Sequence, residues 1–250
     1  MSRVLEVAGL AKSFGGVEAV RGVGFGVDAG ELLAMIGPNG AGKTTCFNML
    51  NGQLAPDAGS VRLHGAEIVG LEPREISRLG VGRTFQVTAT FGSMTVRENV
   101  QMALLAHHRR LAGCWTPVAE LQREDADRLL ERVSMLGQAG RVCAVLAYGD
   151  LKRVELAVAL ANEPRLLLMD EPTAGMAAAE RSDLMALAAD IARERGIAVL
   201  FTEHDMDVVF AHADRIVVLH RGRVIAQGKP AEVGANPEVR EVYLGSWGNA

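Results

Sequence analysis

Aromatic residues and cysteines are scarce in this chain. Phe, Trp and Tyr make up 4% of its 250 residues, and the three cysteines, Cys46, Cys114 and Cys143, are widely spaced with no CxxC pair. This spacing predicts neither a zinc site nor a disulfide framework, and it fits a reducing cytosol. Because 49% of the residues are hydrophobic, we expect a globular fold built on aliphatic packing.

Long apolar runs and blocks of basic residues are also missing. No stretch approaches the roughly 20 consecutive apolar residues that span a bilayer, and the first residues, MSRVLEVAGLAKSF, lack the apolar segment of a signal peptide. The net charge is −4, with charges spread along the chain, which argues against a nucleic-acid partner. If the protein serves a membrane, we expect it to act from outside the bilayer.

Apolar segments alternate with helical patterns along most of the chain, which predicts an α/β fold with a mostly parallel sheet and flanking helices. Strands are expected at 4–10, 23–27, 31–36, 61–63, 81–85, 165–169, 197–201 and 216–219, and helices at 43–50, 151–161 and 180–194. From Thr95 to about Leu136 the pattern is helical, and Thr95 and Glu98 have the spacing of a capping box. This section predicts a helical insertion that divides one domain into two lobes.

Residues 37–44, Gly-Pro-Asn-Gly-Ala-Gly-Lys-Thr, match the GxxxxGK[ST] pattern between an expected strand and an expected helix. Glycines let successive backbone N–H groups turn toward phosphates, and the N-terminus of the next helix adds partial positive charge. Lys43 is predicted to contact the β- and γ-phosphates, and the Thr44 hydroxyl to bind Mg²⁺. The alternative is a glycine-rich turn before a helix, but the match at every fixed position favours nucleotide binding.

Two acids, Asp170 and Glu171, follow the apolar strand expected at 165–169. Ligands bind at the carboxyl ends of strands in open parallel sheets, so we expect these acids to face the phosphate loop. Asp170 is predicted to hold Mg²⁺, and Glu171 to polarise the attacking water. His204 follows the next strand and is expected to bridge Glu171 and the γ-phosphate. The alternatives are a solvated helix start for the acids and a structural role for the histidine.

The segment Leu-Ala-Tyr-Gly-Asp at 146–150, with the helix expected after it, resembles the LSGGQ signature of the ATP-binding cassette (ABC) family. In that family the signature presents a helix N-terminus to the γ-phosphate held by a second subunit, so the resemblance implies a dimer closed by ATP. It also implies that Phe14 stacks on adenine, unless Phe14 is a core residue. Gln86 resembles the family's glutamine that senses Mg²⁺ and the attacking water.

The resemblance covers residues 3–245 and implies a P-loop NTPase core with an N-terminal antiparallel β portion and an inserted helical subdomain. We expect one domain, with 1–90 and 162–250 as the nucleotide-binding core and 91–161 as the helical signature subdomain. The expected catalytic residues are Lys43, Gln86, Glu171 and His204, and the expected metal ligands are Thr44, Gln86 and Asp170. The expected ATP-binding residues are Phe14, Gly37, Pro38, Asn39, Gly40, Ala41, Gly42, Lys43, Thr44, Thr45, Ala147, Tyr148 and Gly149.

Finer features resemble the ATPase subunits of branched-chain amino acid importers: the Leu-Ala-Tyr-Gly signature, Thr-Glu-His-Asp-Met at 202–206, and the ending at 236–245. The resemblance implies a peripheral ATPase on the cytoplasmic face of the membrane. Its partners would be membrane permease subunits and, indirectly, an extracytoplasmic substrate-binding protein. A similar tail occurs in the lipopolysaccharide-export ATPase, and amides, urea and aromatic acids are alternative cargoes. A soluble ABC ATPase of DNA repair or translation and a scaffold without turnover fit less well.

Two positions depart from the general ABC pattern. Ala147 stands where the signature has serine, and Ala177 stands where the interface loop has aspartate. The resemblance places both at the dimer interface, so we expect a heterodimer with a paralogous ATPase. Cys46 is interpreted as a small buried residue, with a reactive thiol as the alternative. Phe91 and Met94 are expected to line a groove for a membrane subunit, or else to pack between the lobes.

Overall fold

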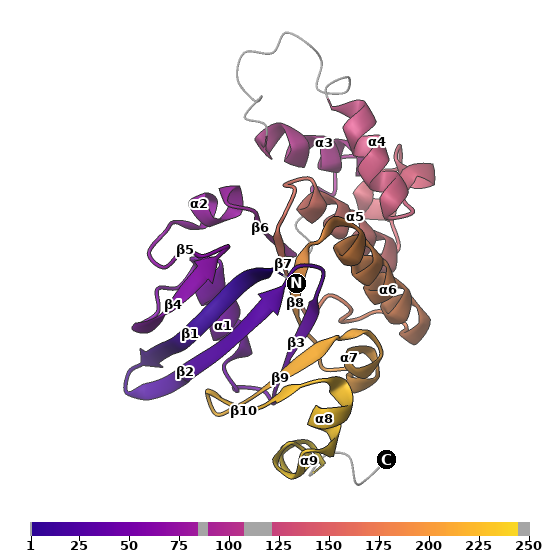
Figure 1. Cartoon of the computed structure of the whole chain (residues 1–250). Coiled ribbons are helices and arrows are strands. Elements are labelled where there is room, and N and C mark those ends of the chain that lie inside the picture. The colour runs from indigo at the N-terminus through magenta and orange to yellow at the C-terminus, as the bar shows by residue number, and fades with distance from the viewer. Residues whose placement is uncertain (1, 85–89, 108–121, 245–250) are drawn as a thin grey trace.

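The computed structural model describes residues 2–84, 90–107 and 122–244. Figure 1 shows two sheets in one part of the molecule and a group of helices standing away from them. The larger sheet has six strands in the order β10-β9-β3-β8-β7-β6, and the smaller has four in the order β2-β1-β4-β5. Among the described residues, no helix is both long enough and apolar enough to cross a bilayer.

The six-stranded sheet is parallel from β6 to β9, and β10 pairs antiparallel with β9 at its edge. Every residue of β3, β7 and β8 is buried, as expected for parallel strands covered on both faces. The bounds are β3 Leu32–Ile36, β6 Val81–Thr84, β7 Leu166–Asp170, β8 Ala198–Thr202, β9 Arg215–His220 and β10 Arg223–Gly228. The predicted α/β fold with a mostly parallel sheet is confirmed.

The smaller sheet is antiparallel. The two sheets share one hydrophobic core, and α1 (Lys43–Leu50) packs in it. Phe47 of α1 belongs to the same buried cluster as Leu5 and Leu33, whereas Ile36 belongs to the cluster on the other side of β3. Side chains of a strand alternate between its two faces, so β3 is fixed from both sides just before residue 37. The remaining bounds are β1 Arg3–Phe14, β2 Val17–Asp28, β4 Ala58–Leu63, β5 Ala66–Glu67 and α2 Pro73–Arg78.

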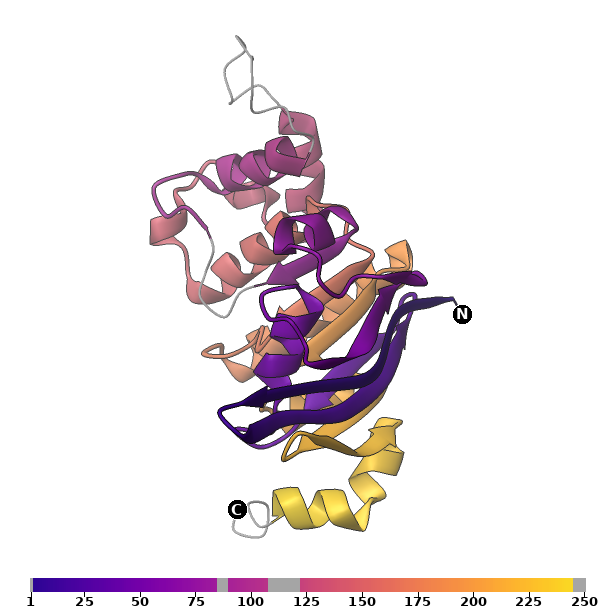
Figure 2. The ribbon, with the colours of Figure 1, turned by 90° about the vertical axis from the view of Figure 1, so that its left-hand side faces the viewer.

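The helical lobe consists of α3 (Val96–His107), α4 (Arg123–Arg132) and α5 (Tyr148–Leu160). Figure 2 shows this lobe beyond the sheets, at the end of the molecule opposite the C-terminus. The predicted capping box starts it: Thr95 N donates to Glu98 Oε2 over 2.7 Å, and Glu98 N donates to Thr95 Oγ1 over 3.2 Å. The helix expected from Leu151 begins three residues earlier, at Tyr148, because Ala147 has the extended backbone of an N-cap.

The other face of the large sheet is covered by α6 (Ala178–Arg195) and α7 (Met206–His212), and the chain ends with α8 (Pro230–Ala235) and α9 (Pro237–Leu244). Our sequence analysis did not predict α2, α7, α8, α9, β5 or β10. These elements are two to eight residues long, too short for a clear hydrophobic period. Prolines at the start of α8 and α9 fit the first helical turn, where an N–H has no intrahelical partner.

Candidate functional site

The turn between β3 and α1 has the local structure that its sequence predicts. β3 ends at Ile36, and α1 begins at Lys43. Gly42, at the N-cap, has a φ of 108°, and a Cβ there would lie 2.6 Å from the backbone oxygen of Ala19. A residue with a side chain would therefore be strained and would collide with β2. Glycine at this position lets the loop close against β2 and leaves backbone N–H groups at the start of α1 available for an anion.

Lys43 is buried and folds back along this loop. Its Nζ donates to the backbone oxygens of Gly37, over 2.6 Å, and Pro38, over 3.3 Å. Burial lowers the pKa of the Lys43 ammonium, and the negative charges of Glu171 and Asp170 partly oppose this change. A cation held among carbonyl oxygens and near two carboxylates is well placed to bind the phosphates of a nucleotide.

The carboxyl end of β7 carries the two acids. Asp170 is buried, and its Oδ1 accepts a 2.8 Å hydrogen bond from Thr202 Oγ1 on the neighbouring strand β8. Glu171 has a left-handed φ of 49°, and its N–H donates to Thr202 Oγ1 over 3.0 Å. A non-glycine residue in this conformation costs about 1–3 kcal/mol and persists where its surroundings enforce it, often at functional sites.

Glu171 and His204 form the contact expected from the sequence. His204 Nε2 lies 2.9 Å from Glu171 Oε1, and the two side chains are 50% and 23% exposed. The contact follows from the sheet, since Asp170 pairs with Thr202 between the adjacent parallel strands β7 and β8. The side chains that follow β7 and β8 therefore meet at the carboxyl end of the sheet.

A cavity of about 320 Å³ brings most of the expected residues together. Its volume lies within the roughly 300–1,000 Å³ of small-molecule pockets. Phe14 is 49% exposed at the rim, with Lys12 Nζ 5.7 Å from its ring centroid, so the alternative of a core phenylalanine is wrong. The lining residues are Phe14, Ala19, Asn39, Gly40, Ala41, Gly42, Lys43, Thr44, Thr45, Glu171 and His204.

Other expected residues lie elsewhere. Asp170 is not among the lining residues of this cavity, although its charge acts on Lys43. Ala147 is the N-cap of α5, and Tyr148 and Gly149 begin its first turn; none of the three lines the cavity. Tyr148 is 42% exposed, and Ala147 makes no side-chain cap to the helix. Gln86 lies outside the residues that the structure describes.

Arg83 is a site residue that our sequence analysis missed. It lies on β6, beside β7, and its Nη2 donates to Asp170 Oδ2 over 3.2 Å. Its Nη1 donates to Asn48 Oδ1 on α1, over 3.0 Å, and to Gln53 Oε1, over 2.9 Å. Arg83 therefore connects the helix after the phosphate loop to the acid at the end of β7. An arginine in a short apolar strand is the only sequence signal that points to it.

Glu203 is a second residue that we missed. It is buried, and its Oε1 accepts hydrogen bonds from Thr173 N, over 2.8 Å, and Thr173 Oγ1, over 2.7 Å. Burial raises the pKa of the Glu203 carboxyl, and the Thr173 hydrogen bonds partly oppose this rise. Its position between Thr202 and His204 could have indicated that it supports the histidine segment.

Cys46 lies in α1 and is completely buried. Burial raises the pKa of its thiol to about 12. The thiolate is the reactive form of cysteine, so Cys46 is protonated near neutral pH. The alternative of a reactive thiol beside the phosphate loop is therefore wrong, and Cys46 packs as a small apolar residue.

Known families match this chain in two regions. The family described as "ABC transporter" matches residues 20–174, and the one described as "Branched-chain amino acid ATP-binding cassette transporter" matches residues 223–246. The chain is 43% identical to the high-affinity branched-chain amino acid transport ATP-binding protein BraF of Pseudomonas aeruginosa, over 98% of this chain and 99% of the relative. It is 39% identical to LivG of Escherichia coli, a protein described in the same words, over 97% and 98%.

Solved structures agree with these relatives. The ADP conformation of MJ1267, an ATP-binding cassette of an ABC transporter, matches with a TM-score of 0.88 and 31% identity, over 98% of this chain and all of that one. A dimeric post-hydrolysis state of the cassette MJ0796, bound to ADP and Pi, matches with a TM-score of 0.75 and 25% identity, over 90% and 98%. The fold is thus shared with nucleotide-binding cassettes.

Proposed function

The chain belongs to the ABC transporter family, and we propose that it drives the uptake of branched-chain or related amino acids. Members of this family hydrolyse ATP to power transport, and this chain is an ATPase of that kind. The cargo is proposed because the relatives BraF and LivG carry branched-chain amino acid transport in their names, and because residues 223–246 match the family described in the same terms.

We assign binding and catalysis to separate groups of residues. The glycine loop and Lys43 hold the phosphates, and Phe14 at the rim supports the adenine. Glu171 orients the attacking water and accepts its proton, and His204 holds the Glu171 carboxylate toward the phosphates. Most of the catalysis by such a site is positioning and charge stabilisation.

Two oxygen donors near the phosphate loop have the chemistry that Mg²⁺ requires. The hydroxyl of Thr44 and the carboxylate of Asp170 are hard oxygen donors, which this ion prefers. Among the described residues, no group of three or more His, Cys, Asp or Glu side chains could hold a metal alone. This agrees with an ion shared between one or two side chains and the substrate's own phosphates. When bound with ATP, Mg²⁺ would supply positive charge that offsets the negative charge of the phosphates.

The contact between Glu171 and His204 beside the phosphate loop is the main observation that supports ATP hydrolysis at this site. We expect Glu171→Gln to retain ATP binding and to lose turnover, because the amide keeps the shape but cannot accept a proton. The measurements are phosphate release and binding of a fluorescent ATP analogue, with the exposed Glu6→Gln as the control. Wild-type turnover in Glu171→Gln would assign the catalytic role to another residue.

We also propose a heterodimer with a paralogous ATPase. Ala147 lies at the N-cap of α5 and Ala177 at the N-cap of α6, and neither side chain makes a cap hydrogen bond. A serine hydroxyl that donates to a phosphate contributes about 1.5–3 kcal/mol, and a homodimer would lack this at both sites. Sedimentation of Glu171→Gln with ATP and without Mg²⁺ tests this. A tight homodimer at micromolar concentration would contradict it.

For the membrane partner, we propose the exposed apolar residues beside the helical lobe as the contact with permease subunits at the cytoplasmic face. Phe91 is 58% exposed and Val145 is 65% exposed. Their segments lie together, since Ala144 N donates to Gly92 O over 3.0 Å. The exposure of Phe91 supports the groove expected from the sequence over packing between the lobes, and exposed apolar groups of this kind mark interaction sites.

A further inference from the structure

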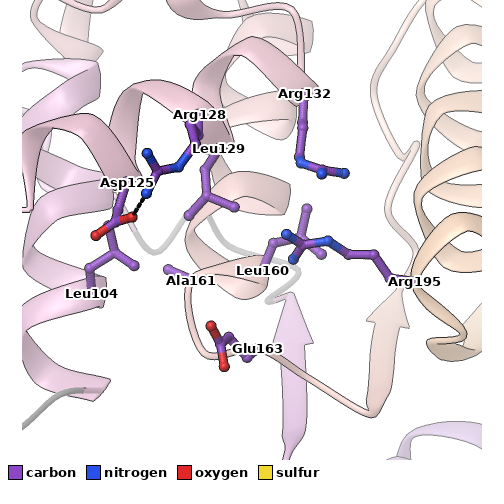
Figure 3. A pocket seen from close by; sticks show the side chains of 9 residues that line it. All are labelled: Leu104, Asp125, Arg128, Leu129, Arg132, Leu160, Ala161, Glu163 and Arg195. Atoms are coloured by element: carbon purple, nitrogen blue, oxygen red, sulfur yellow. Dashed lines mark hydrogen bonds and ion pairs between the residues drawn. The ribbon is translucent and has the colours of Figure 1, made fainter.

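A cavity beside the helical lobe shares no residue with the nucleotide site. Its volume is about 430 Å³, and it lies between α4, the end of α5 and the end of α6. Figure 3 shows aliphatic side chains lining its centre and charged side chains around it. The aliphatic residues are Leu104, Leu129, Leu160 and Ala161. The volume suits a small molecule. The remaining lining residues are charged: Asp125, Arg128, Arg132, Glu163 and Arg195.

Two of the three arginines at this cavity are already neutralised. Arg128 forms an ion pair with Asp125, one turn earlier on α4. Arg132 Nη1 lies 2.9 Å from Glu194 Oε2, which connects α4 to α6. Each pair places a carboxylate beside the guanidinium, so neither arginine adds net charge for a ligand.

Arg195 and Glu163 are different. Neither side chain forms a hydrogen bond or an ion pair within the part of the chain that the structure describes. Arg195 reaches from α6 toward Leu160, and Glu163 lies below it, next to Ala161 (Figure 3). Among the described residues, the cavity thus presents one cation and one anion whose side chains have no partner, with aliphatic side chains between them. Together with the two neutralised arginines, this leaves the site without net charge.

We propose that this cavity binds an aliphatic α-amino acid. Arg195 would hold the α-carboxylate, because a planar guanidinium binds a carboxylate through two parallel hydrogen bonds. Glu163 would accept a hydrogen bond from the α-ammonium, and the aliphatic side chain of the amino acid would contact Leu129 and Leu160. A polyanion fits less well, since Glu163 would repel it and the other arginines are paired. The site contacts α4 and α6 at once, so its occupant joins the helical lobe to the core.

The test uses the full chain and four compounds: L-leucine, leucinamide, 4-methylpentanoate and glycine. Leucinamide lacks the carboxylate, 4-methylpentanoate lacks the ammonium, and glycine lacks the side chain. Saturation-transfer NMR and calorimetry measure binding to the wild type, Arg195→Gln and Glu163→Gln, with the exposed Arg223→Gln as the matched control. Arg195 and Glu163 are exposed, so these variants should fold, and circular dichroism checks this.

Saturable binding of leucine, at least tenfold tighter than that of each of the other three compounds, supports the proposal. Each of Arg195→Gln and Glu163→Gln should weaken leucine binding about tenfold or more, because each removes a charge-assisted hydrogen bond, and Arg223→Gln should not change it. Equal binding of 4-methylpentanoate and leucine would overturn the proposal in favour of an anion site. Absence of saturable leucine binding, or equal binding by all variants, would also overturn it. None of these outcomes depends on the proposed cargo or on ATP hydrolysis.

Discussion

Arg83→Met tests whether the buried contact between Arg83 and Asp170 stabilises the site. The two side chains are 13% and 10% exposed, with Arg83 Nη2 3.2 Å from Asp170 Oδ2. Removal of one member of a buried ion pair leaves the other charge uncompensated, which costs about 3–5 kcal/mol. Asp170 keeps its hydrogen bond from Thr202 Oγ1, so we expect the lower end, about 3 kcal/mol. For a chain of this size, that lowers Tm by about 6–12 °C.

Urea and thermal unfolding, followed by circular dichroism, give this free energy. The matched control is Arg62→Met, whose partner Glu67 lies 3.6 Å away and whose pair is 52% and 43% exposed. Exposed pairs contribute about 0–1 kcal/mol, so the control should unfold almost like the wild type. Arg83→Lys should lie between Arg83→Met and the wild type, because an ammonium lacks the fork that reaches Asp170, Asn48 and Gln53 together.

A double-mutant cycle separates the ion pair from the other contacts of Arg83. In an Asp170→Asn background, Arg83→Met should cost at least about 1 kcal/mol less than in the wild type, because the two residues contact each other. Equal costs in both backgrounds would refute the reasoning, since the loss would then come from Asn48, Gln53 or packing. A loss no larger than that of Arg62→Met would refute it as well.

Three further predictions concern other parts of the chain. Lys43→Ala should weaken ATP binding at least about tenfold by removing charge-assisted hydrogen bonds; an unchanged affinity for a fluorescent ATP analogue, with Lys229→Ala as control, would contradict the assignment. Phe91→Ser should uncouple transport in reconstituted vesicles but spare the basal ATPase of the isolated chain, and a loss of folding would instead indicate a packing role. Glu98→Ala should cost about 0.5–1 kcal/mol, as for other helix caps. The Thr95 hydrogen bonds lower the pKa of Glu98. The stability that Glu98 contributes should therefore be fully present above its unfolded-state pKa and should be lost as pH falls through its folded-state pKa. A destabilisation by Glu98→Ala that does not change with pH would contradict this explanation.

The sequence was sufficient wherever a local pattern determines structure. The strand, glycine loop and helix at 32–50 agree with expectation within one residue, because the turn chemistry, the apolar run and the helix all lie in one segment. The pairing of Glu171 with His204 was also predictable, since both follow buried strands and the ends of parallel strands meet at one edge.

Contacts between distant segments could not be predicted in this way. Arg83 meets Asn48 and Asp170 only because α1 lies between the sheets and β6 pairs with β7, and no local period encodes that packing. The cavity at the end of α6 is a similar case. Arg195 and Glu163 are ordinary surface residues in the sequence, and only the folded chain places them around the same aliphatic surface.

The segments after β7 and β8 are joined by more than the contact between Glu171 and His204. Buried Glu203 accepts hydrogen bonds from Thr173 N and Thr173 Oγ1. Arg181 donates a 2.8 Å hydrogen bond to Met176 O and also forms an ion pair with Asp205. A buried carboxylate without its donors carries a large desolvation cost. The loop at 173–177 therefore cannot shift alone: it either breaks the Thr173 hydrogen bonds or carries Glu203, and with it the adjacent His204. In a dimer that buries Ala177, closure of the interface would therefore move His204 through these contacts.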